Sequence, residues 1–263
     1  MKKFTELVVA LGIIALITIS IAGFIYLYDI TYETPAVIQV CPQIPAIPVE
    51  PIIDLQKILD SSVIVQGIGG MGSGTLIKAT KENMYILTCH HVVDMVIIFQ
   101  EILGESQAKV GYLRTDQYGE TIGSTYYKAE VIKYDEDVDL ALLKVRIIDN
   151  NLKVVPISKK EPKQGDTVYS VGNPLGMIRT LSKGILANKE DGFYMCDNTT
   201  TYGNSGGGLF NDKGELIGVP SNVNGYYAGL DKDKRQTFVP ESGLGFSRNL
   251  KTIKEFLTGV KYE

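Results

Sequence analysis

From residue 54 onward, short apolar segments alternate with turn residues, and this pattern restricts the possible folds most strongly. Gly, Asp, Asn, Lys or Pro separate most of the segments, which is typical of an all-β sandwich or barrel. The segments are rich in Val, Ile, Leu, Phe or Tyr and cover residues 62–66, 75–79, 84–88, 128–134, 140–145, 167–171, 193–197, 208–210 and 216–219. Only Leu250, Ile253, Phe256 and Leu257 recur at helical spacing, and Gly259 is placed to end that helix. We therefore predict an all-β domain over residues 54–263 with a short C-terminal helix.

Charge and cysteine content exclude several functions. The net charge is −4 and the pI is about 5.4, so the chain lacks the basic character of a nucleic-acid-binding protein. The three cysteines, Cys41, Cys89 and Cys196, form no CxxC pair, and at most one disulfide is possible. Cys89, His90 and His91 are consecutive, and consecutive residues on a strand point to opposite faces. We therefore expect no metal site and no cofactor.

The N-terminus contains a segment long enough to cross a membrane. Residues 7–28 carry no charge and would span roughly 33 Å as a helix, so we predict a transmembrane anchor. A cleaved signal peptide is the alternative, but its apolar region would be shorter and would end in small residues. Lys2 and Lys3 precede the segment, which favours a cytoplasmic N-terminus over residues 1–6 and an extracytoplasmic body. Residues 29–53 hold five of the ten prolines, which is typical of an extended linker.

Three motifs carry residues suited to catalysis. They are Thr88-Cys-His-His-Val-Val93, Val138-Asp-Leu-Ala-Leu-Leu-Lys144 and Tyr202-Gly-Asn-Ser-Gly-Gly-Gly-Leu-Phe210. A serine nucleophile needs a histidine to take its proton, a carboxylate to orient that histidine, and N–H donors for the oxyanion. Each motif alone is weak evidence, because histidines, turn aspartates and glycine-rich loops are common. Together they supply every part of a Ser-His-Asp triad.

The order of these residues along the chain separates two classes of hydrolase. Gly203-Asn-Ser-Gly-Gly207 also fits the nucleophile elbow of α/β-hydrolases, in which the histidine follows the serine. No histidine follows Ser205, since the chain contains only His90 and His91. The order His, Asp, Ser is that of the chymotrypsin class.

The motifs resemble those of the HtrA/DegP group of trypsin-like serine proteases. Thr88–Val93 resembles T-N-N-H-V-V, which selects His91, and residues 138–144 resemble T-D-L-A-L-L-K, which selects Asp139. Further similarities are Gly72-Ser-Gly74, Val171-Gly-Asn-Pro-Leu-Gly176, Thr180-Leu-Ser-Lys-Gly-Ile185, Glu215-Leu-Ile-Gly-Val219 and Gly245-Phe-Ser247. The resemblance covers roughly residues 54–258.

This resemblance implies two six-stranded β-barrels with His91, Asp139 and Ser205 between them. It implies an oxyanion hole formed by the N–H groups of Gly203 and Ser205. It also places Thr200 and Thr201 at the substrate, with Gly245, Phe246 and Ser247 pairing with the substrate backbone. Protein or peptide substrates are the implied partners.

Several features depart from the group. PDZ domains usually follow the protease domain, and we expect none here. Residues 221–244 form a longer loop than usual and should lie beside the specificity pocket. No acid precedes the nucleophile in Asn198-Thr-Thr-Thr201, so we expect cleavage after small or medium aliphatic residues unless Asp231 or Asp233 contributes a charge. The residue next to the serine is Asn204, which is neutral and cannot form an ion pair with a freed N-terminal amine. Activation should therefore not require a freed N-terminus.

The leading hypothesis is a serine endopeptidase that acts on unfolded or exposed protein segments. Two alternatives remain: a catalytically inactive protease fold that serves as a binding module, and a processing protease of a virus or mobile element. The sequence does not determine the oligomeric state.

Overall fold

The computed structural model describes residues 13–22, 53–104, 106, 108–115, 121–146, 152–230 and 236–263. The chain divides into two units, Met1–Glu50 and Pro51–Glu263. In the first unit, residues 13–22 are helical and exposed. None of the helices in the described ranges is both long and apolar enough to cross a membrane. The rest of the predicted anchor at 7–28, and the linker up to residue 52, lie outside the described residues.

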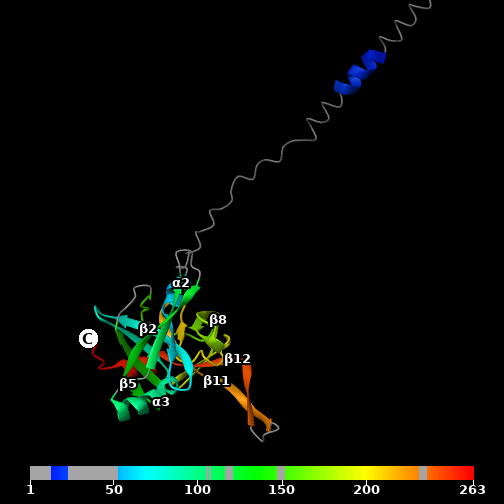
Figure 1. The fold of residues 1–263 in the computed structure, drawn as a ribbon. Helices are drawn as coiled ribbons and strands as arrows, with labels where there is room; N and C mark the ends of the chain where they lie inside the picture. Colours follow the sequence, from blue (N-terminus) through cyan, green and yellow to red (C-terminus); the bar gives the residue numbers. More distant parts are fainter. Residues whose placement is uncertain are drawn as a thin grey trace, which may run out of the picture. The chain divides into compact units, whose positions relative to one another are not determined.

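The second unit contains the two predicted six-stranded barrels, both closed and antiparallel (Figure 1). The strand order is β1-β2-β3-β6-β5-β4 in the first barrel and β10-β11-β12-β9-β8-β7 in the second. The first barrel consists of β1 (Ser62–Gln66), β2 (Met71–Ala79), β3 (Asn83–Thr88), β4 (Ala108–Thr115), β5 (Thr121–Asp135) and β6 (Leu140–Arg146). The second consists of β7 (Thr167–Gly172), β8 (Thr180–Glu190), β9 (Phe193–Cys196), β10 (Gly208–Phe210), β11 (Leu216–Leu230) and β12 (Gln236–Arg248). The remaining elements are α2 (Leu55–Asp60), α3 (His90–Leu103), the 3₁₀ turn η1 (Pro174–Gly176) and α4 (Leu250–Leu257).

Two strands of the first barrel are apolar on both faces because each face packs against a different core. In β6, Ala141 and Leu143 point into the first barrel, whereas Leu140 and Leu142 join a cluster shared with residues of the second barrel. The side chains of β3 alternate in the same way. The shared cluster includes Phe210 from β10, so it fixes the position of one barrel against the other.

Helix α3 was not predicted from the sequence. It begins immediately after Cys89 and ends at Gly104, whose φ of 70° is left-handed. Val93, Val96 and Ile97 are buried against the first barrel at helical spacing. The sequence interpretation treated Cys89 and the two histidines as the end of a strand, which is wrong. Because Cys89 and the two histidines lie at the start of a helix, strand alternation does not separate their side chains.

The prediction that residues 221–244 form a loop is also wrong. β11 and β12 continue through most of this segment and pair with each other from Val219↔Arg248 to Leu230↔Gln236. Their outer part extends beyond the barrel in Figure 1. Residues 231–235, which contain Asp231 and Asp233, lie outside the described residues.

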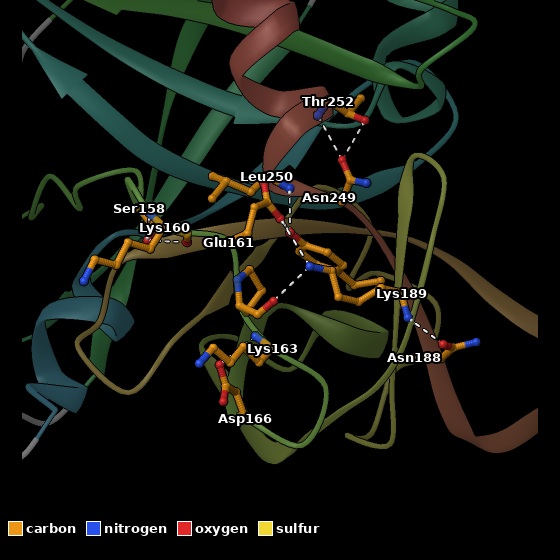
Figure 2. A network of polar contacts seen from close by, with 12 residues as sticks. Ser158, Lys160, Glu161, Lys163, Asp166, Asn188, Lys189, Asn249, Leu250 and Thr252 are labelled. Carbon is orange, nitrogen blue, oxygen red and sulfur yellow. Dashed lines mark hydrogen bonds and ion pairs between the residues drawn. The ribbon is translucent and has the colours of Figure 1, made fainter.

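The predicted C-terminal helix is confirmed as α4. The side chain of Asn249 caps it by accepting hydrogen bonds from the Thr252 N–H and hydroxyl, both at 2.9 Å. Figure 2 shows how its start is attached to the second barrel. The buried Tyr194 hydroxyl donates to Glu161 and accepts from the N–H of Leu250. This anchorage holds α4 against β9.

Candidate active site

His91 and Asp139 meet at one end of the first barrel. His91 lies in the first turn of α3, and Asp139 ends the turn before β6. The His91 Nδ1 atom is 2.9 Å from Oδ2 and 3.0 Å from Oδ1 of Asp139, and the His91 N–H donates to Oδ1 at 3.0 Å. The side chain of His91 is 45% exposed and that of Asp139 is 12% exposed. The carboxylate is therefore enclosed, whereas the imidazole is open to solvent on its other side.

Asp139 is held in an ionised state by its hydrogen bonds. Burial alone would raise its pKa, but donation from the His91 ring, the Ser221 hydroxyl and the His91 N–H outweighs that effect and lowers the pKa below its usual value. The φ of Asp139 is 52°, in the left-handed region that aspartate tolerates better than most residues. Its N–H donates to the Glu136 carbonyl at 3.2 Å, which fixes the turn.

Ser205 faces the same space from the second barrel. Its hydroxyl donates to the Ser221 carbonyl at 3.3 Å, and no hydrogen bond within the described part of the chain joins it to His91. Catalytic hydrogen bonds are often absent or long before substrate binds. Gly206, with φ of 85°, passes so close to the first barrel that a Cβ would lie 2.2 Å from the Ser73 carbonyl oxygen and the Thr88 hydroxyl. Only glycine fits there.

The backbone on either side of Asn204 has the form of an oxyanion hole. The Gly203 carbonyl accepts from the Ser73 hydroxyl at 2.6 Å, and the Ser205 carbonyl accepts from the Ser73 N–H at 2.8 Å. The Tyr202 carbonyl accepts from the Leu175 N–H at 2.9 Å. Each of these contacts orients a carbonyl oxygen of residues 202–205 toward its donor. Among the described residues, the N–H groups of Gly203 and Ser205 have no acceptor.

Ser73 is itself fixed by the turn after β7. Its hydroxyl accepts from the Asn173 N–H at 2.8 Å and from the Asn173 side-chain amide at 3.1 Å. The Asn173 side-chain oxygen in turn accepts from the N–H of Arg179, whose guanidinium pairs with Asp60 of α2 at 2.9 Å. A chain of buried and half-buried polar contacts therefore runs from α2 to Gly203.

A single cleft of about 940 Å³ contains all three residues of the predicted triad. Thr200, Thr201, Tyr202, Ser221 and Arg248 line it from the second barrel, and His90, Asp94, Ile97, Ile98, Glu101, Tyr134 and Glu136 line it from the first. In the described part of the chain, no hydrogen bond or ion pair joins His90 to Asp139. Its ring stacks on Tyr134 with 5.5 Å between the ring centroids.

One expectation about substrate binding does not hold. Gly245, Phe246 and Ser247 were expected to pair with the substrate backbone, but these residues already pair with β9 on one side and β11 on the other. They offer no free strand edge. Gly245 instead packs against Thr200, since a Cβ at Gly245 would lie 2.3 Å from the Thr200 hydroxyl.

Cys89 has a structural role beside the site. It is fully buried, and its thiol donates to the Pro220 carbonyl at 3.2 Å. Burial, and then the nearby charge of Asp139, raise the pKa of this thiol well above its usual value. Cys89, His91 and Asp139 place their ligand atoms within 4.8 Å of one another. A neutral thiol that donates its proton is a poor metal ligand, so these residues are better explained by packing and the His91–Asp139 pair. Cys196 is also buried and unpaired.

Two residues that contact the candidate site, Ser73 and Ser221, were not predicted from the sequence. Ser73 touches both ends of the oxyanion segment, and the Ser221 hydroxyl donates to Asp139 Oδ2. Gly72-Ser-Gly74 was recognised as a motif, but nothing in the sequence indicated which backbone atoms its serine would contact.

Comparison with known proteins agrees with this geometry. A profile of the trypsin-like peptidase domain matches residues 72–219, more than half of the chain. The periplasmic pH-dependent serine endoprotease DegQ of Escherichia coli (strain K12) is 29% identical over 163 residues, which cover 59% of this chain and 31% of DegQ. Serine endoprotease DegS of Salmonella typhimurium (strain 14028s / SGSC 2262) is 31% identical over 131 residues, which cover 46% of this chain and 34% of DegS. The chain thus spans about a third of the length of these relatives.

A solved structure has a similar fold. The crystal structure of the serine endoprotease from Yersinia pestis matches with a TM-score of 0.54 and 26% sequence identity. The match covers 76% of this chain and 62% of that one. The chain therefore belongs to the trypsin-like peptidase family, in which its relatives are HtrA-type serine proteases of the DegP, DegQ and DegS kind.

Proposed function

We propose that the protein is a serine endopeptidase with His91, Asp139 and Ser205 as its catalytic triad. The observation that carries the proposal is the single cleft in which the His91–Asp139 pair faces Ser205. Beside it, the N–H groups of Gly203 and Ser205 have no acceptor among the described residues. None of these groups contributes to a hydrophobic core, so packing does not explain why they meet.

The geometry assigns a role to each ring nitrogen of His91. Nδ1 faces Asp139, so Nε2 is the atom available to Ser205. The Ser205 hydroxyl turns from the Ser221 carbonyl toward Nε2 and gives up its proton as Oγ attacks the substrate carbonyl carbon. Asp139 stabilises the imidazolium that forms. His91 then protonates the leaving amine, and water hydrolyses the acyl-enzyme by the same steps.

The negative oxygen of the tetrahedral intermediate is stabilised by the Gly203 and Ser205 N–H groups. Loss of one such donor costs about 3–4 kcal/mol in proteases of this kind. Because Ser73 and Leu175 hold the neighbouring carbonyls away, the hole is formed before substrate arrives. The contact between Gly245 and Thr200 supports a specificity pocket at these residues, and we propose that it takes small or medium aliphatic side chains.

Covalent labelling tests the proposed nucleophile directly. A fluorophosphonate probe reacts with an activated serine, and peptide mass spectrometry of the full chain should place its adduct on Ser205. Ser205→Ala should remain unlabelled. Wild-type protein that is folded but unlabelled would support the inactive binding module instead.

We also propose that residues 7–28 hold the protein in a membrane. The absence of charge over this segment and the preceding Lys2 and Lys3 support the proposal. In membrane fractions the full chain should resist alkaline carbonate and be released by detergent. Release by carbonate alone would contradict it.

A further inference from the structure

The outer parts of β11 and β12 form a two-stranded ribbon, which consists of residues 224–230 and 236–243. Inside the barrel, β12 pairs with both β9 and β11. Within the ribbon, the pairs from Gly225↔Pro240 to Leu230↔Gln236 join these two strands and, in the described ranges, no third strand. The register shifts between Val223 and Gly225 and again between Ala228 and Leu230. Isolated two-stranded ribbons are marginally stable in water, and an open strand edge is a template for another strand. The ribbon therefore has the form of a platform that a further strand would complete.

The open edge of β11 begins at the nucleophile. Along this edge, Phe210 and Leu209 of β10 pair with Leu216 and Gly218. The next contacts are the Gly206 N–H to the Pro220 carbonyl at 2.8 Å and the Ser205 hydroxyl to the Ser221 carbonyl at 3.3 Å. From residue 222 to residue 230 no strand in the described ranges pairs with this edge. A polypeptide that continues the sheet here has one end at Ser205.

The two edges of the ribbon are not equivalent. β12 contains Pro240, which has no N–H to offer to a neighbouring strand, whereas β11 has no proline beyond Pro220. Residues 222–230 of β11 contain no proline, so none of the N–H groups that face this edge is missing. At about 3.3 Å per residue, and less at the two register shifts, these nine positions extend at most about 30 Å from the nucleophile.

We propose that the β11 edge of the ribbon binds the substrate as an added antiparallel strand, far beyond the residues next to the scissile bond. This inference rests on the proposed endopeptidase function. Antiparallel pairing is the slightly more stable arrangement, and it places the residues N-terminal to the scissile bond along the ribbon. The substrate class is then long, extended segments with about nine residues on the acyl side. Because the contacts are to the main chain, recognition tolerates many sequences.

The length of the platform is tested with a series of peptides that share one cleavage sequence. The full-chain protein is assayed with peptides that carry three, five, seven or nine residues on the acyl side. The catalytic efficiency, kcat/KM, should rise at each step up to nine. A value that stops rising at three or four residues would overturn the proposal.

The pairing geometry is tested by N-methylation of the nine-residue peptide, one position at a time. Successive N–H groups of a strand point to opposite sides, so only alternate positions donate to the β11 edge. Beyond the fourth residue from the cut, methylation at these positions should lower kcat/KM about two- to tenfold, the effect of one hydrogen bond. The intervening positions are the matched controls and should change it less than twofold. Losses without this alternation would overturn the proposal.

Two further results separate this inference from its alternatives. If Ser205→Ala forms dimers that the nine-residue peptide does not dissociate, as measured by light scattering, the edge binds a second copy and the proposal is wrong. If short peptides are cleaved but added length has no effect, this inference fails and the proposed function stands. If no peptide is cleaved and the fluorophosphonate probe leaves Ser205 unlabelled, the proposed function itself fails.

Discussion

His90 and His91 are adjacent, but within the described residues only His91 forms a hydrogen bond with a carboxylate. His91→Ala should lower kcat/KM by several orders of magnitude, because the base and its link to Asp139 are both lost. His90→Ala removes a ring that stacks on Tyr134 and should retain most of the activity. Both variants should remain folded by circular dichroism. The reverse order of effects in a peptide assay would show that the base is wrongly assigned.

Ser73 should act on catalysis through Gly203. In Ser73→Ala, the Gly203 carbonyl and the Asn173 N–H lose their partner, so the oxyanion segment is no longer fixed. We expect kcat to fall about tenfold with little change in KM, since a buried group left unpaired costs about 1–3 kcal/mol.

A matched control for this change is Ser62→Ala. Ser62 is also a buried serine on the first barrel, and its hydroxyl has no hydrogen-bond partner in the described part of the chain. Its removal should leave kcat unchanged. Equal losses of kcat in the two variants would show that Ser73 contributes only to packing.

The lowered pKa of Asp139 predicts a pH-dependent contribution to stability. A carboxyl whose pKa is lower in the folded protein stabilises it above the unfolded pKa of about 3.9, and that contribution is lost as the pH falls through the folded value. Asp139→Asn should therefore reduce the free energy of unfolding more at pH 6 than at pH 3. Urea denaturation in a Ser205→Ala background, which prevents self-cleavage, measures the difference. A loss of equal size at both pH values would contradict the prediction.

The sequence specified the candidate triad because each residue lies in a distinctive motif and their order excludes the α/β-hydrolases. It did not specify Ser221 or Ser73, because a serine in a strand has no local pattern that identifies its partner. Ser221 reaches Asp139 across 82 positions, and Ser73 reaches Gly203 across 130. These contacts depend on how the two barrels pack.

At the scale of elements, strands with a clear apolar pattern were predicted well. β1 and β10 have the predicted bounds, and β6 differs by one residue. α3 was missed because Val92, Val93, Val96 and Ile97 are β-branched and also suit a strand. The ribbon was missed because its glycines, and the charged residues at 231–235, are typical of loops.

The cap of α4 gives a test at this scale. Asn249→Ala removes the acceptor for two groups of Thr252, and such losses cost about 1 kcal/mol. The free energy of unfolding, measured by urea denaturation, should fall by that amount. Asn249→Ser keeps a capping oxygen, so its free energy of unfolding should stay close to that of the wild type. Identical destabilisation by both substitutions would mean that the cap is unimportant.

At the scale of the whole molecule, the shared cluster fixes the two barrels so that their separate residues form one cleft. Leu140 and Leu142 in this cluster are fully buried, and Asp139 directly precedes Leu140 in the chain. Ser205 similarly precedes β10, whose Phe210 packs in the same cluster. The candidate nucleophile and the candidate acid are thus positioned by the same hydrophobic contact between barrels.

Digestion of an unfolded protein is the most direct test of the proposed endopeptidase activity. Purified full-chain protein and its Ser205→Ala variant are each incubated with a reduced, unfolded substrate protein, and the products are identified by mass spectrometry. We expect internal cleavage by the wild type, mainly after small or medium aliphatic residues, and none by the variant. Equal cleavage by both proteins, or no cleavage by a folded wild type, would contradict the proposal that Ser205 is the nucleophile of an endopeptidase.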